Sequence, residues 1–357
     1  MLRRKARGVP RSRPPAIRSG PACPPAMPRI LIPELRAAPA RPAGGTVRAL
    51  EGATMGTRWL VRWAGDPGPE DLRPGIQARL DTVVAQMSGW EAESDLSRFN
   101  RAPAGTWQDL PADVLAVMDC ALAVAAETGG AFDPTLGRLV DLWGFGPRPT
   151  PVEGPPGEAL LAPARAGAGW QRLRLDVPNR RLLQPGGLAL DLSGIAKGHA
   201  VDLVAEHLAA ASIPAFLVEI GGELRGQGVK PDGTPWWVAL ETPPGEAPAG
   251  EQFVVALHGL SVATSGDYRR SFRHGGRRYG HTLDPRTGWP LAESLASVTV
   301  LHPSCMRADA LATALGVLGV EAGLDHAGRY DIAALFLTRE DGRLREHMSP
   351  AFAAMLD

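Results

Sequence analysis

Short apolar segments separated by glycine and proline turns place the strongest limit on the fold of this chain. The segments that fit strands lie at 47–63, 188–192, 216–220, 236–241, 252–257, 260–264, 268–273, 277–283, 296–301, 332–338 and 343–347. Gly275-Gly276 and Asp341-Gly342 each stand between two such segments, which is typical of β-hairpin turns. Since strands joined by tight turns pair antiparallel, we expect largely antiparallel sheets.

Other stretches have apolar residues at helical spacing. They lie at 76–88, 112–127, 195–211 and 304–318. The stretch 147–168 is rich in Pro, Gly and Ala, so we expect a loop or a weak helix there. Helices packed on antiparallel strands predict an α+β fold, here as a single large domain.

The first 45 residues differ in composition from the rest. Residues 1–48 carry ten Arg and one Lys against a single acid, Glu34. Such a proline-rich segment has too little apolar surface to fold, so 1–45 is predicted to be a disordered leader and 46–357 the folded domain. No apolar h-region follows the basic residues, so no signal peptide is recognised and the chain as written fits the cytoplasm. A targeting signal in this basic segment is the alternative, and both interpretations of the compartment stay open. The chain contains no run of about 18 apolar residues, so no membrane-spanning helix is predicted.

Charge, cysteine content and missing motifs exclude several classes of protein. The formal net charge is zero, so no overall field favours nucleic acid or an anionic membrane. The three cysteines are far apart and have neither disulfide-framework nor metal-ligand spacing. Neither a Walker phosphate loop nor a Rossmann glycine fingerprint is present. A bound nucleotide would therefore be held by a different type of binding site.

Asp309 and Thr313 stand four residues apart in the helix expected at 304–318. Residues at this spacing share a helix face. A carboxylate and a hydroxyl are hard oxygen ligands suited to Mg²⁺ or Ca²⁺. A helix that merely carries two polar residues has the same spacing, so both interpretations stay open.

Asp191 to Gly198 runs into the helix expected at 195–211. Free N–H groups and the positive dipole end of a helix suit a phosphate, and Lys197 adds a charge. An ordinary capped helix with a solvated lysine is the alternative. Asp133 and His281 are ambiguous in the same way, because an Asp before proline fits a turn and a single histidine is more often structural than catalytic.

Eight segments rich in Gly, Asp and Thr follow one another in a definite order. They are Met55-Gly56-Thr57, Ser94 to Asn100, Gly130 to Thr135 with Leu142 to Gly146, Asp191 to Gly198, Ile220 to Glu223, Thr264 to Tyr268, His281 to Gly288, and Ala308 to Thr313. In this order they resemble the ApbE-type flavin transferases. The resemblance covers about residues 50–320 and continues more loosely to the end.

The resemblance implies an activity, its cofactors and its partners. Such enzymes bind FAD with Mg²⁺, cleave the FAD pyrophosphate, and pass FMN to a threonine hydroxyl of an acceptor protein while AMP leaves. Typical acceptors are subunits of Na⁺-pumping NADH:quinone reductase, Rnf-type complexes or related flavoproteins. The resemblance implies no nucleic-acid partner.

The resemblance also implies roles for particular residues. His281 matches the catalytic histidine. Asp309, Thr313 and the backbone oxygen of Gly194 match the Mg²⁺ ligands, while Ala312 stands where some relatives carry an acid. The residues that match FAD contacts are Met55, Asp95, Leu96, Ser97, Ala131, Phe132, Asp133, Asp191, Lys197 and Leu283.

Two other activities would use the same residues. One is a Mg²⁺-dependent FAD pyrophosphatase that releases FMN and AMP to water. The other is a flavin-binding protein without turnover, which would need neither a metal nor a base.

Overall fold

An eight-stranded antiparallel sheet forms the centre of the molecule. The computed structural model describes residues 28–34, 39, 42, 45–66, 68–147, 154–244, 246 and 252–356. The strands follow the spatial order β16 (Arg343–Met348), β15 (Ala333–Glu340), β14 (Leu295–His302), β11 (Leu260–Gly266), β8 (Glu223–Gln227), β7 (Phe216–Ile220), β3 (Thr57–Ala64) and β2 (Val47–Thr54). Every neighbouring pair in this sheet is antiparallel, as the short turns predict.

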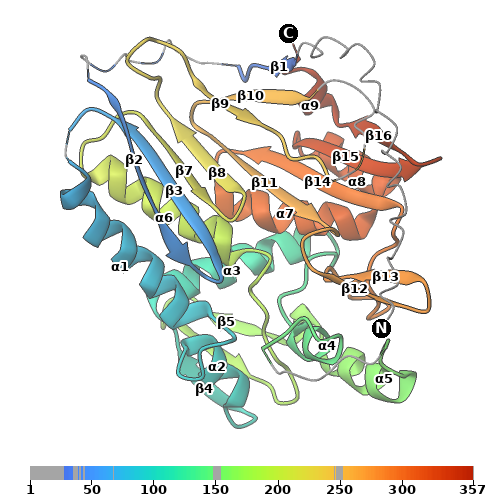
Figure 1. Cartoon of the computed structure of the whole chain (residues 1–357). Helices are drawn as coiled ribbons and strands as arrows, with labels where there is room; N and C mark the ends of the chain where they lie inside the picture. The colour runs from blue at the N-terminus through green and yellow to red at the C-terminus, as the bar shows by residue number, and fades with distance from the viewer. Residues whose placement is uncertain are drawn as a thin grey trace, which may run out of the picture.

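Helices cover one face of this sheet (Figure 1). They are α1 (Pro69–Met87), α3 (Ala112–Glu127), α6 (Ala196–Ala210), α7 (Cys305–Leu318) and α8 (Val320–Arg329). Helix α6 packs on β7 and β8, and α7 packs on β11 and β14. The large core between helices and sheet includes Trp59, Leu208 and Leu311, all essentially inaccessible to solvent. The α+β class predicted from the sequence is confirmed.

A small sheet covers the opposite face. Its order is β1 (Arg29–Leu31), β10 (Phe253–Leu257) and β9 (Trp236–Ala239), with β1 parallel to β10. Leu31 is fully buried in the second core, which the small sheet shares with α9 (Pro350–Ala353). The boundary expected at residue 46 is therefore wrong for β1, because apolar residues of distant strands provide the surface that a proline-rich segment lacks by itself. Residues 1–27 lie outside the described part of the chain.

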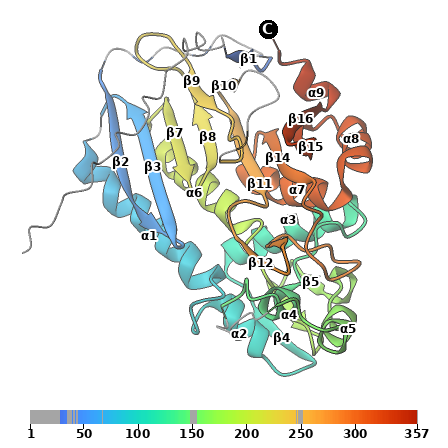
Figure 2. The same ribbon diagram turned by 45° about the vertical axis from the view of Figure 1, so that its right-hand side comes forward.

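A third region holds the remaining elements (Figure 2). It contains α2 (Asp95–Arg101), α4 (Gly137–Leu142), α5 (Glu158–Gly167) and the sheet β4 (Thr106–Asp109), β6 (Arg181–Gln184), β5 (Arg174–Asp176). The hairpin of β12 (Ser271–His274) and β13 (Arg277–Gly280) lies beside it. A separate aromatic cluster around Trp143 joins the hairpin to α4 and α5.

Some expectations need correction. Residues 188–192 form no strand, because Leu190 exchanges hydrogen bonds with the Asn100 side chain of α2 and only Ala189 forms a bridge, with Leu136. The uncertain stretch 147–168 contains α5. The strand expected at 268–273 begins only at Ser271, since β11 continues to Gly266.

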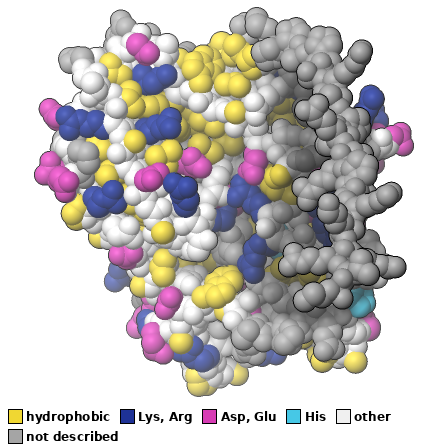
Figure 3. All heavy atoms as spheres, viewed as in Figure 1, with side chains coloured by type: hydrophobic (Ala, Val, Ile, Leu, Met, Phe, Trp, Pro, Cys, Tyr) yellow, Lys and Arg dark blue, Asp and Glu magenta, His cyan; other side chains and the backbone are white. Residues whose placement is uncertain are grey.

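Two surface features bear on function. No helix in the described ranges has both the length and the apolar character needed to cross a bilayer. On the face seen in Figure 3, basic and acidic side chains are interspersed over β2 and β3, so this region has no single-signed field.

Candidate functional site

Helices α6 and α7 cross at close range, and this crossing is the centre of the candidate site. The backbone N–H of Gly198 in α6 donates to Oδ2 of Asp309 in α7 at 3.0 Å. A Cβ on Gly198 would lie only 2.3 Å from the carbonyl oxygen of Cys305. Glycine alone permits this approach, which buries the Asp309 carboxylate against the first turn of α6.

Asp202 holds the N-terminus of α7 against α6. Its carboxylate accepts hydrogen bonds from the Ser304 hydroxyl at 2.8 Å and from the backbone N–H groups of Cys305 and Met306 at 3.0 Å. Arg225 of β8 donates to the same carboxylate at 2.6 Å. A carboxylate stabilises the free N–H groups and the dipole of a helix start. Asp202 thereby sets the position of α7 along α6.

Gly194, Asp309 and Thr313 come together at this crossing. A Cβ on Gly194 would lie 3.1 Å from Oγ1 of Thr313, so a larger residue would press on that hydroxyl. A carboxylate, a hydroxyl and a backbone carbonyl are hard-oxygen ligand types that suit Mg²⁺, so these three residues stay the predicted metal ligands. Within the described ranges, no cluster of three or more His, Cys, Asp and Glu is arranged to hold a metal ion. A cation here would therefore depend on these mixed donors and on oxygens of a bound substrate.

Half-buried Lys197 and fully buried Glu223 form an ion pair beside Asp309. Nζ of Lys197 lies 2.6 Å from Oε1 of Glu223 and 3.9 Å from Oδ1 of Asp309. Burial raises the pKa of Glu223 to about 7 against the opposing effect of Lys197. Burial alone would lower the pKa of Lys197, but Asp309 and Glu223 raise it overall. The Lys197 ammonium is thus charged at neutral pH at the start of α6, where a phosphate would be stabilised.

His281 follows β13 directly. Its backbone N–H donates to the Arg270 carbonyl at 3.1 Å, and its Nδ1 lies 3.2 Å from the same oxygen. Burial lowers the pKa of His281 to about 4, and the charges of Arg270, Lys197 and Arg269 act in the same direction, against the hydrogen bond to Arg270. The imidazole is therefore neutral at physiological pH. With Nδ1–H donating to Arg270, Nε2 is the nitrogen that can accept a proton.

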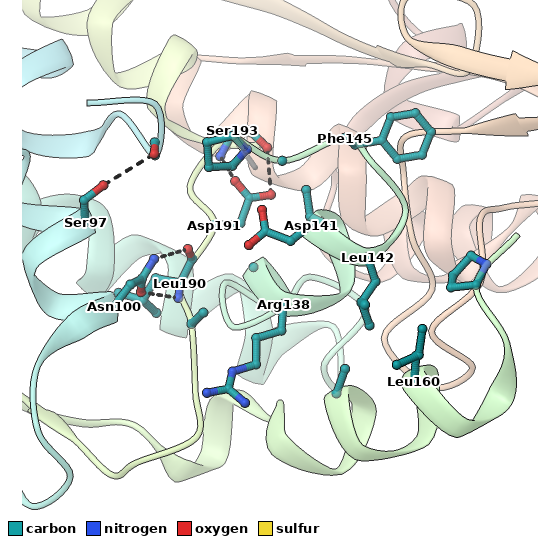
Figure 4. A pocket seen from close by; sticks show the side chains of 18 of the residues that line it. Ser97, Asn100, Arg138, Asp141, Leu142, Phe145, Leu160, Leu190, Asp191 and Ser193 are labelled. Carbon is teal, nitrogen blue, oxygen red and sulfur yellow. Dashed lines mark hydrogen bonds between the residues drawn. The ribbon is translucent and has the colours of Figure 1, made fainter. Parts of the chain in front are cut away.

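A cavity of about 1100 Å³ opens next to this region (Figure 4). Its walls come from α2, α4, α5 and the segment before α6, and include Ser97, Asp141, Phe145, Asp191 and Ser193. The Asp191 carboxylate accepts hydrogen bonds from the Ser193 N–H at 3.0 Å and hydroxyl at 2.9 Å, and burial raises its pKa. The Phe145 ring packs edge-on against His281 at 6.3 Å between centroids. The cavity and His281 thus share a wall.

Comparison with known proteins identifies the family. Residues 55–336 match the model of the ApbE family. The chain belongs to the ApbE family. Relatives named FAD:protein FMN transferase include those of Haemophilus influenzae (37% identical; 87% of this chain and 92% of the relative covered), Vibrio cholerae (39%; 86% and 92%) and Escherichia coli K12 (35%; 89% and 92%). Among solved structures, the apo form of the Pseudomonas stutzeri flavinyl transferase ApbE is similar with a TM-score of 0.80 at 42% identity, covering 87% of this chain and 97% of that one.

Besides Asp191 and Lys197, other residues implied to bind FAD in an ApbE protein lie near the cavity or the helix crossing. Leu96 and Ser97 of α2 line the cavity, whereas Asp95 of the same helix pairs with Arg98. The Phe132 ring lies 3.5 Å from the Cβ position of Gly194.

Other implied FAD residues have local partners in this structure. Asp133 accepts from Thr135 and from the Trp170 N–H, and burial raises its pKa. Ala131 is buried in the main core. Met55 occupies the β2–β3 turn with a φ of 47°, in the left-handed region. Leu283 is buried in the Trp143 cluster. Their contacts with FAD stay a prediction.

Three polar residues near the site of this ApbE protein were not predicted from the sequence. Glu223 stands in a quoted motif without a role, Asp202 lies four residues after Gly198 on α6, and Arg270 belongs to an arginine-rich stretch. The Arg270 guanidinium lies 5.7 Å from the Trp90 ring and donates to the Phe145 carbonyl at 2.8 Å. Trp90 and Phe145 both line the cavity, so Arg270 connects the hairpin to the cavity wall.

Proposed function

We propose that this chain transfers the FMN half of FAD to a hydroxyl of an acceptor protein and releases AMP. The proposal rests on the membership of this chain in the ApbE family. The chain matches relatives named FAD:protein FMN transferase over nearly their whole length. The neighbouring arrangement of cavity, helix crossing and neutral histidine agrees with this chemistry. FAD is the substrate, and the acceptor hydroxyl is that of a threonine in a flavoprotein subunit.

The donor set at the helix crossing is the proposed Mg²⁺ site. Asp309, Thr313 and the Gly194 carbonyl would hold the ion. When bound, Mg²⁺ would neutralise negative charge on the pyrophosphate. Lys197 adds a fixed positive charge on the same side, and Glu223 keeps its ammonium in place.

His281 is the proposed general base. A threonine hydroxyl is a weak nucleophile and needs a proton acceptor. The Arg270 carbonyl holds the imidazole through Nδ1 and leaves Nε2 for the proton of the hydroxyl. A pKa of about 4 makes a weak base, but a bound pyrophosphate would bring negative charge near the ring and raise that pKa towards neutrality.

The deciding experiment supplies FAD, Mg²⁺ and a purified acceptor domain from an Rnf-type or Na⁺-pumping NADH:quinone reductase subunit. In-gel flavin fluorescence measures FMN on the acceptor, and chromatography measures free FMN and AMP. We expect one AMP for each flavin on protein. Free FMN in solution with an unlabelled acceptor would indicate a pyrophosphatase. Unchanged FAD would indicate a flavin-binding protein without turnover.

A further inference from the structure

The two oxygens of the buried Asp309 carboxylate have different surroundings. Oδ2 accepts the hydrogen bond from the Gly198 N–H at 3.0 Å. Oδ1 accepts no hydrogen bond from the residues that the structure describes, and Nζ of Lys197 lies 3.9 Å from it. That separation is longer than a hydrogen bond. Oδ1 is therefore the oxygen of Asp309 that is left for a metal ion.

An ammonium group so near to Oδ1 competes with a metal ion for it. Both are cations that bind carboxylate oxygens, and they repel each other at short range. The lysine side chain is a flexible four-carbon stem. A movement of about 1 Å would bring Nζ of Lys197 within hydrogen-bond distance of Asp309. A metal site at Asp309 therefore requires a group that restrains Lys197.

Glu223 supplies this restraint. Its Oε1 lies 2.6 Å from Nζ of Lys197, the distance of a charge-assisted hydrogen bond, whereas Oδ1 of Asp309 lies 3.9 Å away. The Glu223 side chain is only 1% exposed, so solvent screens its attraction for the ammonium very little. Lys197 is therefore bonded to Glu223 and not to Asp309.

The backbone fixes the position of Glu223. Gly221 and Gly222, which join β7 to β8, adopt φ values of 61° and 101°. The Gly221 N–H donates to the Arg58 carbonyl at 3.0 Å, and the Gly221 carbonyl accepts from Arg269. A Cβ on Gly222 would lie 2.2 Å from Nη2 of Arg269, so the guanidinium group packs directly on this turn. Glu223 follows the turn at once, and its carboxylate is thereby held at one place beside α6.

The second carboxylate oxygen of Glu223 indicates that fold stability is not the main role of the ion pair. Oε2 is buried, and it has no hydrogen-bond partner in the described part of the chain. A buried polar atom without a partner reduces the free energy of unfolding. Such an atom calls for an explanation, and a role at a functional site is one.

We propose that Glu223 is a positioning residue of the metal site, which holds the Lys197 ammonium off Asp309 and so keeps Oδ1 open for the cation. This inference rests on the proposed function, in which Asp309 is a ligand of Mg²⁺. Glu223 acts through Lys197 and not as a ligand itself.

The test measures metal binding to the full chain without flavin or acceptor. Mn²⁺ takes the place of Mg²⁺, because its electron paramagnetic resonance spectrum gives the concentration of free ion. The titrations are run at pH 8, above the pKa of about 7 that burial gives Glu223. The variants are Glu223→Gln, Lys197→Met and the two together. The matched control is Glu346→Gln, which removes the carboxylate of the Arg29–Glu346 ion pair at the edge strand β16.

We expect Glu223→Gln to bind Mn²⁺ about 10–100-fold more weakly than the wild type, as is typical when a partner behind the metal ligands is lost. The double variant should regain most of the affinity, because it removes the ammonium together with its restraint. Lys197→Met should bind Mn²⁺ at least as tightly as the wild type, and Glu346→Gln should bind it equally.

Wild-type affinity in Glu223→Gln would overturn the inference. A double variant as weak as Glu223→Gln would also overturn it, because Glu223 would then act without Lys197. If Glu223→Gln does not fold by circular dichroism, Lys197→Met decides, and weaker binding than in the wild type refutes the competition. A wild-type chain that binds no Mn²⁺ refutes it as well. Failure of flavin transfer is a separate result, seen as an unlabelled acceptor domain with the wild-type chain.

Discussion

Replacing Gly198 by alanine tests the geometry of the helix crossing most directly. The new Cβ would lie 2.3 Å from the Cys305 carbonyl oxygen and 2.8 Å from Cα of Met306. Since non-bonded carbon contacts begin near about 3.5 Å, α6 and α7 would have to separate by about 1 Å. Both clashing atoms belong to the backbone of α7, so no side-chain rotation can relieve the strain.

The cost has two parts. Overpacking of a core contact costs about 1–3 kcal/mol. Separation of the helices also stretches the hydrogen bond from Gly198 to the Asp309 carboxylate, and a bond to a charged group contributes about 1.5–3 kcal/mol. We therefore expect a loss of about 3–5 kcal/mol in the free energy of unfolding, which lowers Tm by roughly 5 °C. The transfer rate should fall at temperatures where the variant is still folded, because Asp309 moves.

The assay combines thermal unfolding with flavin transfer measured well below both Tm values. Gly316→Ala is the matched control, since Gly316 is buried in α7 and its Cβ position has only ordinary contacts of 3.6 Å or more. Alanine there should be neutral or slightly stabilising, because it favours helix. A Tm of Gly198→Ala close to that of the wild type would refute the close-contact argument. A lowered Tm with an unchanged transfer rate would refute the link from helix spacing to activity.

Three further predictions concern the proposed metal ligand, the proposed base and strand β1. Asp309→Asn keeps an acceptor for the Gly198 N–H but removes the negative charge, so Tm should change little while the transfer rate falls by orders of magnitude. Near-normal transfer by this variant in chelator-treated buffer would contradict the metal assignment. His281→Ala should reduce the transfer rate by about 10²–10⁴-fold with little change in the FAD dissociation constant, and a loss of affinity with the rate retained would assign His281 to binding. A chain that starts at Thr46 lacks β1 and the buried Leu31. Its free energy of unfolding, measured by urea titration, should be about 2–3 kcal/mol lower than that of a chain that starts at Met27. Equal urea midpoints of the two chains would show that β1 does not stabilise the fold.

The pH dependence of stability gives a fifth test. The pKa of His281 lies at about 4 in the folded chain against 6.5 for a free imidazole. Between these values the unfolded chain binds a proton at His281 and the folded chain does not. The contribution of neutral His281 to the free energy of unfolding is therefore fully present above pH 6.5 and is lost as the pH falls towards about 4. Acid unfolding of His281→Gln, followed by circular dichroism, should therefore begin at a lower pH than that of the wild type.

Elements whose signals are local could be predicted from the sequence. Helix α3 has the bounds expected from its apolar spacing, its proline start and its double-glycine end, because each signal acts within a few residues. The hairpin turns at Gly275-Gly276 and Asp341-Gly342 follow for the same reason, since both residues of each turn adopt positive φ. The helical spacing of Asp309 and Thr313 likewise placed both residues on one helix, α7.

Long-range contacts decided the rest. Leu188 to Leu192 is apolar enough for a strand, but its backbone is bonded to an Asn100 side chain that lies 90 residues earlier. The segment at Arg29–Leu31 has no periodicity of its own, yet it joins a sheet because β10 offers an apolar edge. No local pattern contains either partner.

The sequence by itself determined the α+β class, the family and the residue types available for chemistry. Only the tertiary structure decided that Gly198 meets Asp309 across 111 residues, and that Lys197 has Glu223 as its buried partner. It also decided that the arginine-rich hairpin ends at His281. The physical reason is that a pKa and a close backbone approach both depend on which distant groups are neighbours, and packing of the whole chain settles that.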